Sequence, residues 1–139
     1  MAQHIVCRID ELPVGQSRRM QVEGRDIAVF NVNGTFAAIA NLCPHEGASL
    51  CKGKVSGLPK ADAAEPGSYR LERQGEMVRC PWHGWEFDIR TGKSYCDPAR
   101  TRVRSYDVAV ASGAELQEGP YQIDVYEVSL KDEYIILTV

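Results

Sequence analysis

Apolar residues in this chain recur in short runs, often alternating with polar residues, and not at the three-to-four-residue spacing of an amphipathic helix. The runs are rich in β-branched and aromatic residues. Gly, Pro, Asn and Asp separate them, as is typical of strands joined by turns. This pattern predicts an all-β fold of antiparallel strands. The expected strands are 5–9, 18–22, 26–32, 35–40, 68–73, 77–79, 85–88, 103–111, 122–130 and 133–139.

Turn residues indicate how several of these strands are connected. The Glu-Gly pair at 23–24 and the Asn-Gly pair at 33–34 suit two-residue hairpin turns, which need residues that tolerate positive φ. A third hairpin, between the last two expected strands, should turn at the Lys-Asp pair 131–132. The predicted arrangement is an antiparallel meander.

One stretch lacks periodicity and is expected to be loop-like. The sequence "SGLPKADAAEPGS", residues 56–68, is rich in Ala, Gly and Pro. We expect one domain over 1–139, with an insertion at about 58–73 and a further extra stretch at 111–125. Long inserts in a compact domain are often binding surfaces, although surface decoration explains them equally well.

Composition excludes several classes of partner. The chain has 139 residues, 16 basic and 19 acidic, and a formal net charge of -3, so no general nucleic-acid footprint is expected. No apolar run approaches the roughly 18 residues of a membrane span, and the first residues lack the pattern of an export signal. A cytoplasmic protein that does not bind membranes is expected.

The cysteine count favours metal or redox chemistry. An odd number of cysteines in a reducing compartment argues against a disulfide framework. Three of the five are expected to be small buried hydrophobic residues, as free cysteines often are. These three are Cys7, Cys51 and Cys96, and the remaining two are Cys43 and Cys80.

The remaining two cysteines each belong to a Cys-His pair. "CPH" at 43–45 and "CPWH" at 80–83 are separated by 34 residues, 46 through 79. Two thiolates and two imidazoles on two short loops are ligands that zinc or an iron-sulfur cluster would accept. A binuclear cluster explains the mixed pairs if one iron takes both cysteines and the other both histidines. A structural zinc site, a Cys-His nucleophile and ordinary core residues are the alternatives.

With the residues around these pairs, the sequence resembles Rieske [2Fe-2S] proteins. The similarity covers the first 50 residues and extends through the Gly-Trp-x-Phe-Asp stretch to Thr91-Gly92, as in small Rieske ferredoxins and the Rieske domains of ring-hydroxylating oxygenases. It implies three antiparallel sheets with one [2Fe-2S] cluster per chain, held by two loops at one tip. The implied ligands are Cys43, His45, Cys80 and His83.

The resemblance also implies how the cluster is shielded and tuned. High-potential members carry a disulfide between the two loops, where this chain has Ala48 and Trp82, and hydroxyl residues where it has Trp85 and Phe87. Fewer hydrogen bonds to sulfur lower the potential, so we expect about -150 mV, the low end of the Rieske range. Shielding is expected from Trp82, Trp85, Phe87 and, on a third loop, Pro98.

The histidine count limits the function. Of three histidines, two are assigned to the cluster, so no facial triad for oxygen activation can be built, and no Gly-rich dinucleotide motif is present. We expect a one-electron carrier that is not itself an enzyme, acting between a reductase and a terminal oxygenase or other redox enzyme, without a small-molecule substrate. A non-catalytic subunit of a larger oxidoreductase and a redox-sensing interaction module are the alternatives.

Charge is unevenly distributed near the end of the chain. Residues 90–104 hold five basic residues against one acidic residue, whereas 107–133 hold seven acidic residues against one basic residue. If the basic segment lies beside the cluster, it could steer an acidic partner face towards it. An ordinary mixed surface is the alternative.

Overall fold

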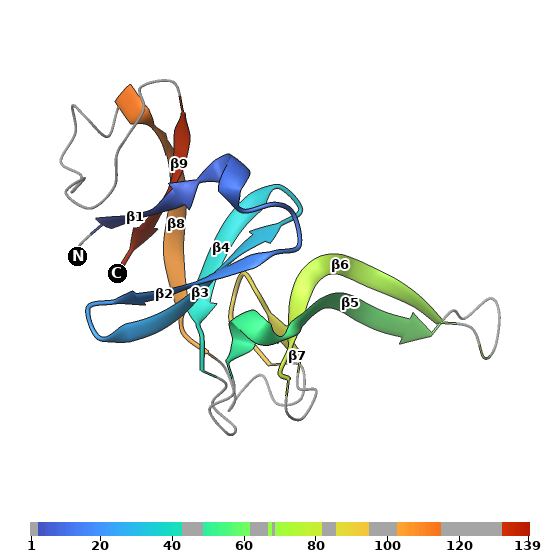
Figure 1. Ribbon diagram of the computed structural model, residues 1–139. Helices are drawn as coiled ribbons and strands as arrows, with labels where there is room; N and C mark the ends of the chain where they lie inside the picture. The colour runs from blue at the N-terminus through green and yellow to red at the C-terminus, as the bar shows by residue number, and fades with distance from the viewer. Residues whose placement is uncertain are drawn as a thin grey trace.

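The computed structural model describes residues 3–42, 49–61, 67, 69–81, 86–94, 103–114 and 132–139. Most of these residues are in strands, and few are helical, which confirms the all-β prediction. Two short 3-10 helices, η1 (Ile9–Glu11) and η2 (Leu50–Lys52), lie between strands. The strands are β1 (Gln3–Arg8), β2 (Ser17–Val22), β3 (Arg25–Val32), β4 (Thr35–Ala40), β5 (Lys54–Ala61), β6 (Tyr69–Arg79), β7 (Glu86–Asp88), β8 (Ser105–Ser112) and β9 (Glu133–Thr138) (Figure 1).

All strand pairings among the described residues are antiparallel and form two sheets. The larger sheet has the order β1-β9-β8-β4-β3-β2, and the smaller has the order β5-β6-β7. Within the larger sheet, β4 and β8 are joined through only two residue pairs, Ala38 with Tyr106 and Ile39 with Ser105. The larger sheet thus consists of two three-stranded parts, which together with β5-β6-β7 correspond to the three sheets that the family resemblance implies.

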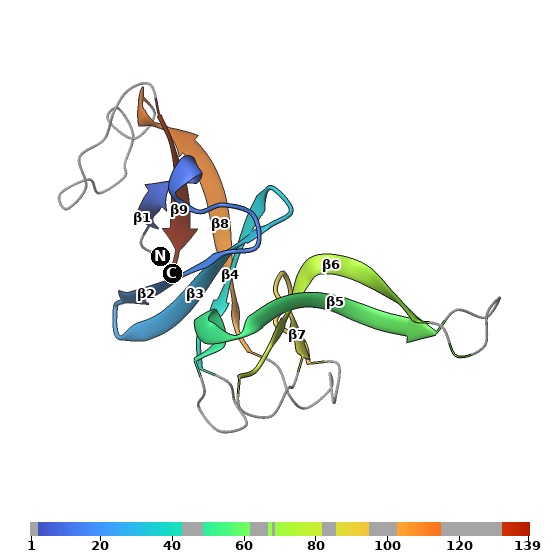
Figure 2. The ribbon, with the colours of Figure 1, turned by 45° about the vertical axis from the view of Figure 1, so that its right-hand side comes forward.

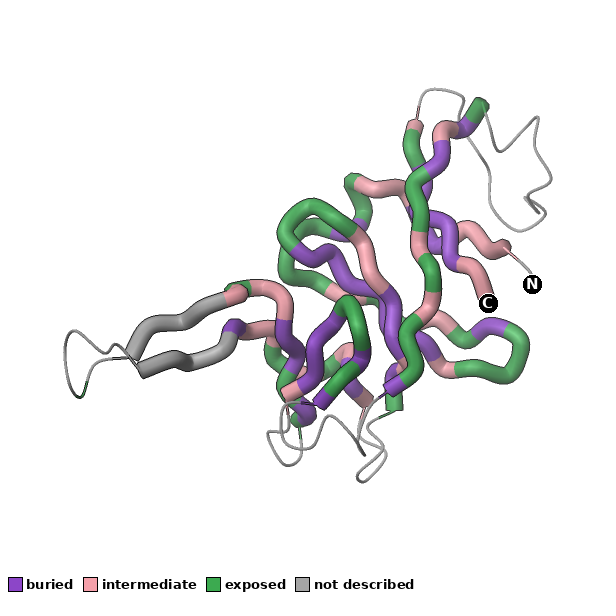
Figure 3. Tube along the Cα trace, turned by 180° about the vertical axis from the view of Figure 1, so that it is seen from behind, coloured by how far each residue is buried: buried purple, intermediate pink, exposed green. Residues whose placement is uncertain are grey.

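β3 is the centre of the core because both of its faces are buried. Phe30 and its alternate neighbours pack towards β5-β6-β7, in a cluster that also contains residues of β4, β6 and β7. Ile27 and Val29 point to the other face and pack against β1 and β9. The continuous apolar run at 27–30 in β3 follows from this double burial. Viewed from behind, the buried residues gather where the sheets meet (Figure 3).

Two of the three expected hairpin turns are confirmed, those at 23–24 and 33–34. Glu23 and Gly24 have φ values of 50° and 75°, and Asn33 and Gly34 have 53° and 98°. Positive φ at both central residues fits a type I′ turn, whose twist matches that of the flanking strands. The Asn31 side chain supports the second turn by accepting a hydrogen bond from the Gly34 amide at 2.9 Å.

The expected loop over 56–68 is wrong at its start. Residues up to Ala61 belong to β5, which pairs with β6 along a hairpin whose register shifts between Ser56 and Leu58. The separate strands expected at 68–73 and 77–79 are one strand, β6, although Arg73 and Gly75 have positive φ where the register shifts. β5 and β6 therefore form a two-stranded ribbon that projects away from the larger sheet (Figures 1 and 2).

The expected last hairpin is also wrong. β9 pairs with β8 on one edge and with β1 on the other, so neither edge is left for a hairpin partner. Gln3 lies opposite Thr138, which brings the beginning and end of the described chain together. The expected strand 122–130 lies outside the described residues. No helix in the described part of the chain is long and apolar enough to cross a membrane.

Candidate metal centre

The first predicted ligand loop begins and ends at two points that the larger sheet holds together. The chain leaves β4 at Asn41 and Leu42, and the described structure resumes at Ser49. Leu42 and Ser49 form an isolated antiparallel bridge, and the Leu50 amide donates a hydrogen bond to the Asn41 carbonyl oxygen at 2.6 Å. The next residues form η2. The ends of this loop are therefore closed by backbone pairing.

The second predicted ligand loop is closed in a similar way by β6 and β7. Arg79, the last residue of β6, pairs with Glu86, the first residue of β7. Their side chains form an ion pair with 3.1 Å between Nη2 and Oε1. Cys80 follows directly. Both predicted loops thus leave and rejoin the sheets at paired positions.

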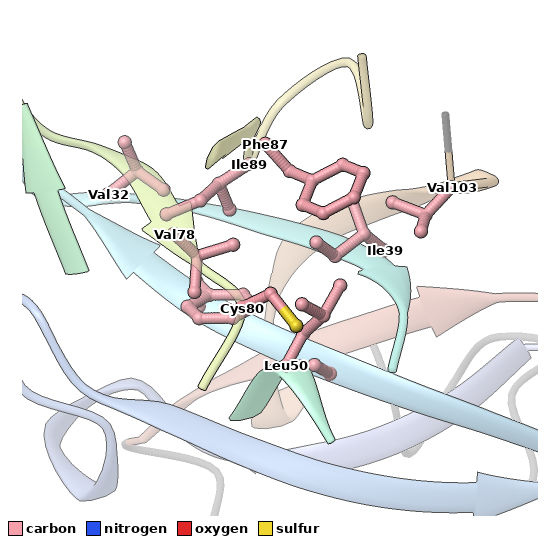
Figure 4. Packing of buried hydrophobic residues seen from close by; sticks show 10 residues of the cluster. Val32, Ile39, Leu50, Val78, Cys80, Phe87, Ile89 and Val103 are labelled. Atoms are coloured by element: carbon pink, nitrogen blue, oxygen red, sulfur yellow. The ribbon is translucent and has the colours of Figure 1, made fainter. Parts of the chain in front are cut away.

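These two pairs of loop ends lie next to each other. Lys54, just after η2, is the direct cross-strand partner of Arg79. Leu50 and Cys80 belong to the same buried cluster, with exposed fractions of 0% and 2%. The Cys80 sulfur lies beside the Leu50 side chain (Figure 4). The fold therefore brings the ends of the two predicted ligand loops to one end of the molecule, although they are far apart in sequence.

Cys80 suits a thiolate ligand of a cluster. It is a free cysteine, nearly excluded from solvent, at the edge of an apolar cluster and next to the end of the other loop. A shielded thiolate beside an apolar wall is the environment in which an iron-sulfur cluster is protected from water. The donor set predicted from sequence and the convergence of the loop ends both fit a [2Fe-2S] group.

The other predicted site residues are placed as follows. Phe87 is described and fully buried in the core, in the same cluster as Cys80. The described residues contain no group of three or more His, Cys, Asp or Glu side chains that could hold a metal ion. The residues outside the described part of the chain are Cys43, His45, His83, Trp82, Trp85 and Pro98.

Two of the three cysteines expected to be structural lie in the described part of the chain. Cys7 is fully buried and Cys51 is half-buried, and both are free, whereas Cys96 lies outside the described residues. Burial raises the pKa of the Cys7 thiol, with the nearby Arg18 acting in the opposite direction. Cys7 is thus the small buried hydrophobic residue that the sequence predicts.

Sequence reasoning missed the polar residues that support the first loop. Asn41 is fully buried at the end of β4, and its side chain contacts Asp26, Ser49 and Cys51. Asp26 forms a two-bond ion pair with Arg19, which together with the Asn41 amide lowers the pKa of Asp26 against the opposing effect of burial. A single Asn before a turn does not reveal such contacts, because Asn favours turns for local reasons.

Comparison with known proteins identifies the family. The family described as "Rieske [2Fe-2S] domain" matches residues 2–107. The chain belongs to the Rieske [2Fe-2S] family. The Rieske resemblance and the cofactor inferred from sequence are thereby confirmed, and the protein carries one [2Fe-2S] cluster per chain.

Similar Rieske proteins are named as ferredoxins. The "3-phenylpropionate/cinnamic acid dioxygenase ferredoxin subunit" of Photorhabdus laumondii is 33% identical over 113 residues, which is 81% of this chain and 90% of that protein. The "p-cumate 2,3-dioxygenase system, ferredoxin component" of Pseudomonas putida is 33% identical over 109 residues, 78% of each chain. The Rieske chain described here is accordingly an electron carrier and not a catalytic enzyme.

Solved Rieske structures share the fold. A ferredoxin from Sphingomonas yanoikuyae has a TM-score of 0.57 and 27% identity, covering 77% of this chain and 88% of its own. The ferredoxin of carbazole 1,9a-dioxygenase from Nocardioides aromaticivorans has a TM-score of 0.61, covering 97% of both chains. The second comparison shows the fold alone, because the identity is 24%.

Proposed function

We propose that this protein is the ferredoxin component of an oxygenase system, taking one electron from a reductase and delivering it to a terminal oxygenase. The observation that carries this proposal is the 33% identity to a dioxygenase ferredoxin subunit across 90% of that protein's length. The convergence of two loop ends at Cys80 supports the same function, because it leaves the predicted cluster at one end of the molecule.

We propose the ligand set from the sequence motif. Cys43 and Cys80 would hold one iron, and His45 and His83 the other. When bound, this group takes up and releases one electron. Cys80 is the member of the set whose surroundings support the assignment, since its thiol is buried against Leu50 and close to the ends of both loops.

The proposed potential is low, about -150 mV. Phe87 supports this value, because its ring carries no hydroxyl and is fully buried in the group of apolar core residues to which Cys80 belongs. Fewer hydrogen bonds to sulfur leave the reduced state less stabilised. We propose Trp82, Trp85 and Pro98 as further shielding residues, on the family resemblance alone.

Docking is proposed to use the end of the molecule where the loop ends meet. Lys52, Lys54, Lys93 and Arg104 are exposed, and none of them has an ion pair with a described carboxylate. Lys54 also lies opposite another cation, Arg79, in the β5-β6 ladder. Such a surface would favour an acidic face on a redox partner. We also propose a cytoplasmic location, in keeping with the free Cys7 and Cys51 thiols.

The subunit alternative has weaker support. The solved structure of a nitrite reductase small subunit from Mycobacterium tuberculosis has a TM-score of 0.63, but its identity of 20% shows a shared fold and no more. The ferredoxin relatives are more similar in sequence and of comparable length. A free carrier is therefore the function that we propose.

Potentiometry with assays of iron and acid-labile sulfide tests this proposal. The anaerobically purified protein should contain two irons and two sulfides and should titrate as a one-electron couple near -150 mV. Cys80→Ala should lose the cluster, whereas Cys7→Ala, at a buried cysteine remote from the loop ends, should keep it. Zinc without sulfide, or a cluster retained in Cys80→Ala, would contradict the proposed ligand set.

A further inference from the structure

The fully buried side chain of Asn41, just before the first ligand loop, forms hydrogen bonds with Asp26 of β3 and with the residues that follow the loop. Its Nδ2 donates to Ser49 Oγ at 2.8 Å and lies 3.2 Å from Asp26 Oδ1. Its Oδ1 accepts a hydrogen bond from the Cys51 amide at 2.8 Å. One side chain on the outgoing strand thus binds two residues on the returning segment. These four residues, Asp26, Asn41, Ser49 and Cys51, are called the clasp below.

The clasp is anchored to the rest of the fold. The backbone amide of Asn41 donates to the backbone carbonyl oxygen of Asp26 at 2.8 Å. Arg19 holds the Asp26 carboxylate through hydrogen bonds of 2.9 and 2.7 Å. On the returning side, Ser17 Oγ donates to the Cys51 carbonyl oxygen at 2.8 Å. The loop ends are therefore fixed to β2 and β3, which pair along six residue positions.

The chemistry of this position requires an amide. A carboxylate at residue 41 could not donate to Ser49 or Asp26, and it would place a second negative charge, at a fully buried position, beside the Asp26 carboxylate. An alanine would leave the Cys51 amide and the Asp26 oxygen without these partners. Only a side chain with both a donor and an acceptor satisfies the whole clasp.

We propose that Asn41 is a positioning residue that holds the first ligand loop closed and thereby sets how long the protein retains its cluster. The inference rests on the proposed ligands Cys43 and His45, which follow Asn41 by two and four residues. We expect iron to leave this loop more readily when the loop ends can separate or distort. The clasp opposes that movement through buried hydrogen bonds, which are costly to leave unmade.

The chain offers a matched control for a variant of Asn41. Asn31 is also a buried Asn whose side chain is both a donor and an acceptor. Its Nδ2 donates to the Leu12 carbonyl oxygen at 2.8 Å, and its Oδ1 accepts a hydrogen bond from the Gly34 amide at 2.9 Å. It supports the turn at 33–34, at the other end of β4. Among the described residues, the Asn31 side chain bonds to Leu12 and Gly34 and not to the ends of either ligand loop, so Asn31→Asp introduces the same chemical change at a separate site.

The experiment compares holoproteins of wild type, Asn41→Asp, Ser49→Ala and Asn31→Asp. Cluster loss is followed under anaerobic conditions as bleaching of visible absorption in the presence of an iron chelator, alongside thermal unfolding and the EPR linewidth of the reduced protein. Ser49→Ala, which removes the hydrogen bond from Asn41 Nδ2 and the 3.2 Å contact with Cys51 Sγ, should accelerate loss about fivefold, and Asn41→Asp should accelerate it further. Both should broaden the EPR signal, whereas Asn31→Asp should lower the unfolding temperature without changing loss by more than about twofold.

The outcomes separate this inference from the proposed function. If wild type contains no cluster with two irons and two sulfides, the proposed function fails. If wild type keeps its cluster and Ser49→Ala loses it no faster, the positioning role of Asn41 is wrong, whether or not Asn41→Asp folds. Equal acceleration in Asn31→Asp and Asn41→Asp would also overturn it, because that result would indicate general destabilisation.

Discussion

Gly53 lies directly against the backbone carbonyl of Arg79. A Cβ atom built on Gly53 would be 2.1 Å from the Arg79 carbonyl oxygen and 3.1 Å from the Val78 side chain. Gly53 follows η2 at the end of the first loop, and Arg79 precedes Cys80 in the second. The absence of a side chain at residue 53 therefore allows the ends of the two ligand loops to approach each other.

Gly53→Ala should disturb the proposed metal centre. The added methyl group forces β5 away from β6 beside Cys80, at a cost of about 1–3 kcal/mol. The free energy of unfolding and the iron content of the purified protein should both decrease. Gly34→Ala is the control, because residue 34 has open space around it but a φ of 98°, so that only backbone strain is introduced. Full iron content in Gly53→Ala would show that the close approach is not needed.

Stability should decrease in acid because of Asp26. Its pKa is lowered, first by the hydrogen bonds from Arg19, so its ionised form is favoured in the folded state. That contribution is present above the ordinary Asp pKa and is lost as pH falls through the lowered value. Because the Asp26 side chain is 16% exposed and Arg19 is 45% exposed, the pair should contribute only about 1 kcal/mol.

Asp26→Asn provides the comparison for the acid effect. The variant should have a lower unfolding temperature than wild type at pH 7, and the difference should shrink as the pH approaches 3. Thermal unfolding followed by circular dichroism at several pH values measures both curves. A difference that stays constant with pH would show that ionisation of Asp26 does not contribute to folding.

Phe87→Tyr should raise the reduction potential. The new hydroxyl would extend from a buried ring that belongs to the same group of apolar core residues as Cys80. The resemblance implies a tyrosine at this position in high-potential Rieske proteins. One hydrogen bond to a charged sulfur, worth about 1.4 kcal/mol, corresponds to about 60 mV for one electron. Potentiometry measures this shift. An unchanged potential in a folded, cluster-containing variant would indicate that residue 87 acts only in packing.

Electron transfer should depend on the charge around the loop ends. Oxidation of the reduced protein by the anionic cobalt(III)-EDTA complex should slow as ionic strength rises, despite the net charge of -3, because Lys54 and its basic neighbours attract the anion. Lys54→Gln should weaken this dependence. Ala109→Glu changes the net charge by the same amount at an exposed position of β8 and should have little effect. A rate that rises with ionic strength in wild type would contradict a basic docking end.

The local pattern of the sequence predicts most strands and turns. β3, β4 and the Asn33-Gly34 turn follow directly, because short runs of apolar residues and the turn residues between them act over a few neighbouring positions. β5 was not predicted, because Gly57 and Pro59 resemble loop residues, and its strand character comes from pairing with β6. Local sequence does not contain that information.

Long-range relationships explain the remaining differences. The sequence does not show that β9 inserts between β1 and β8. Strands that follow each other in sequence usually pair as a hairpin, and only the structure shows that β1 and β8 occupy both edges of β9. The two Cys-His pairs predict the ligand set, because few residue types can bind iron and these pairs can be recognised in the sequence alone. The clasp around Asn41 required the structure, because its members come from three separate segments.

The central claim is that this chain holds a [2Fe-2S] cluster with two cysteine and two histidine ligands and uses it to carry one electron. EPR spectroscopy of the anaerobically purified, dithionite-reduced protein, with iron, zinc and sulfide measured on the same sample, tests it most directly. We predict a rhombic signal with the low average g of a histidine-ligated cluster, at two irons and two sulfides per chain. Zinc without sulfide, or a signal typical of four cysteine ligands, would contradict the claim.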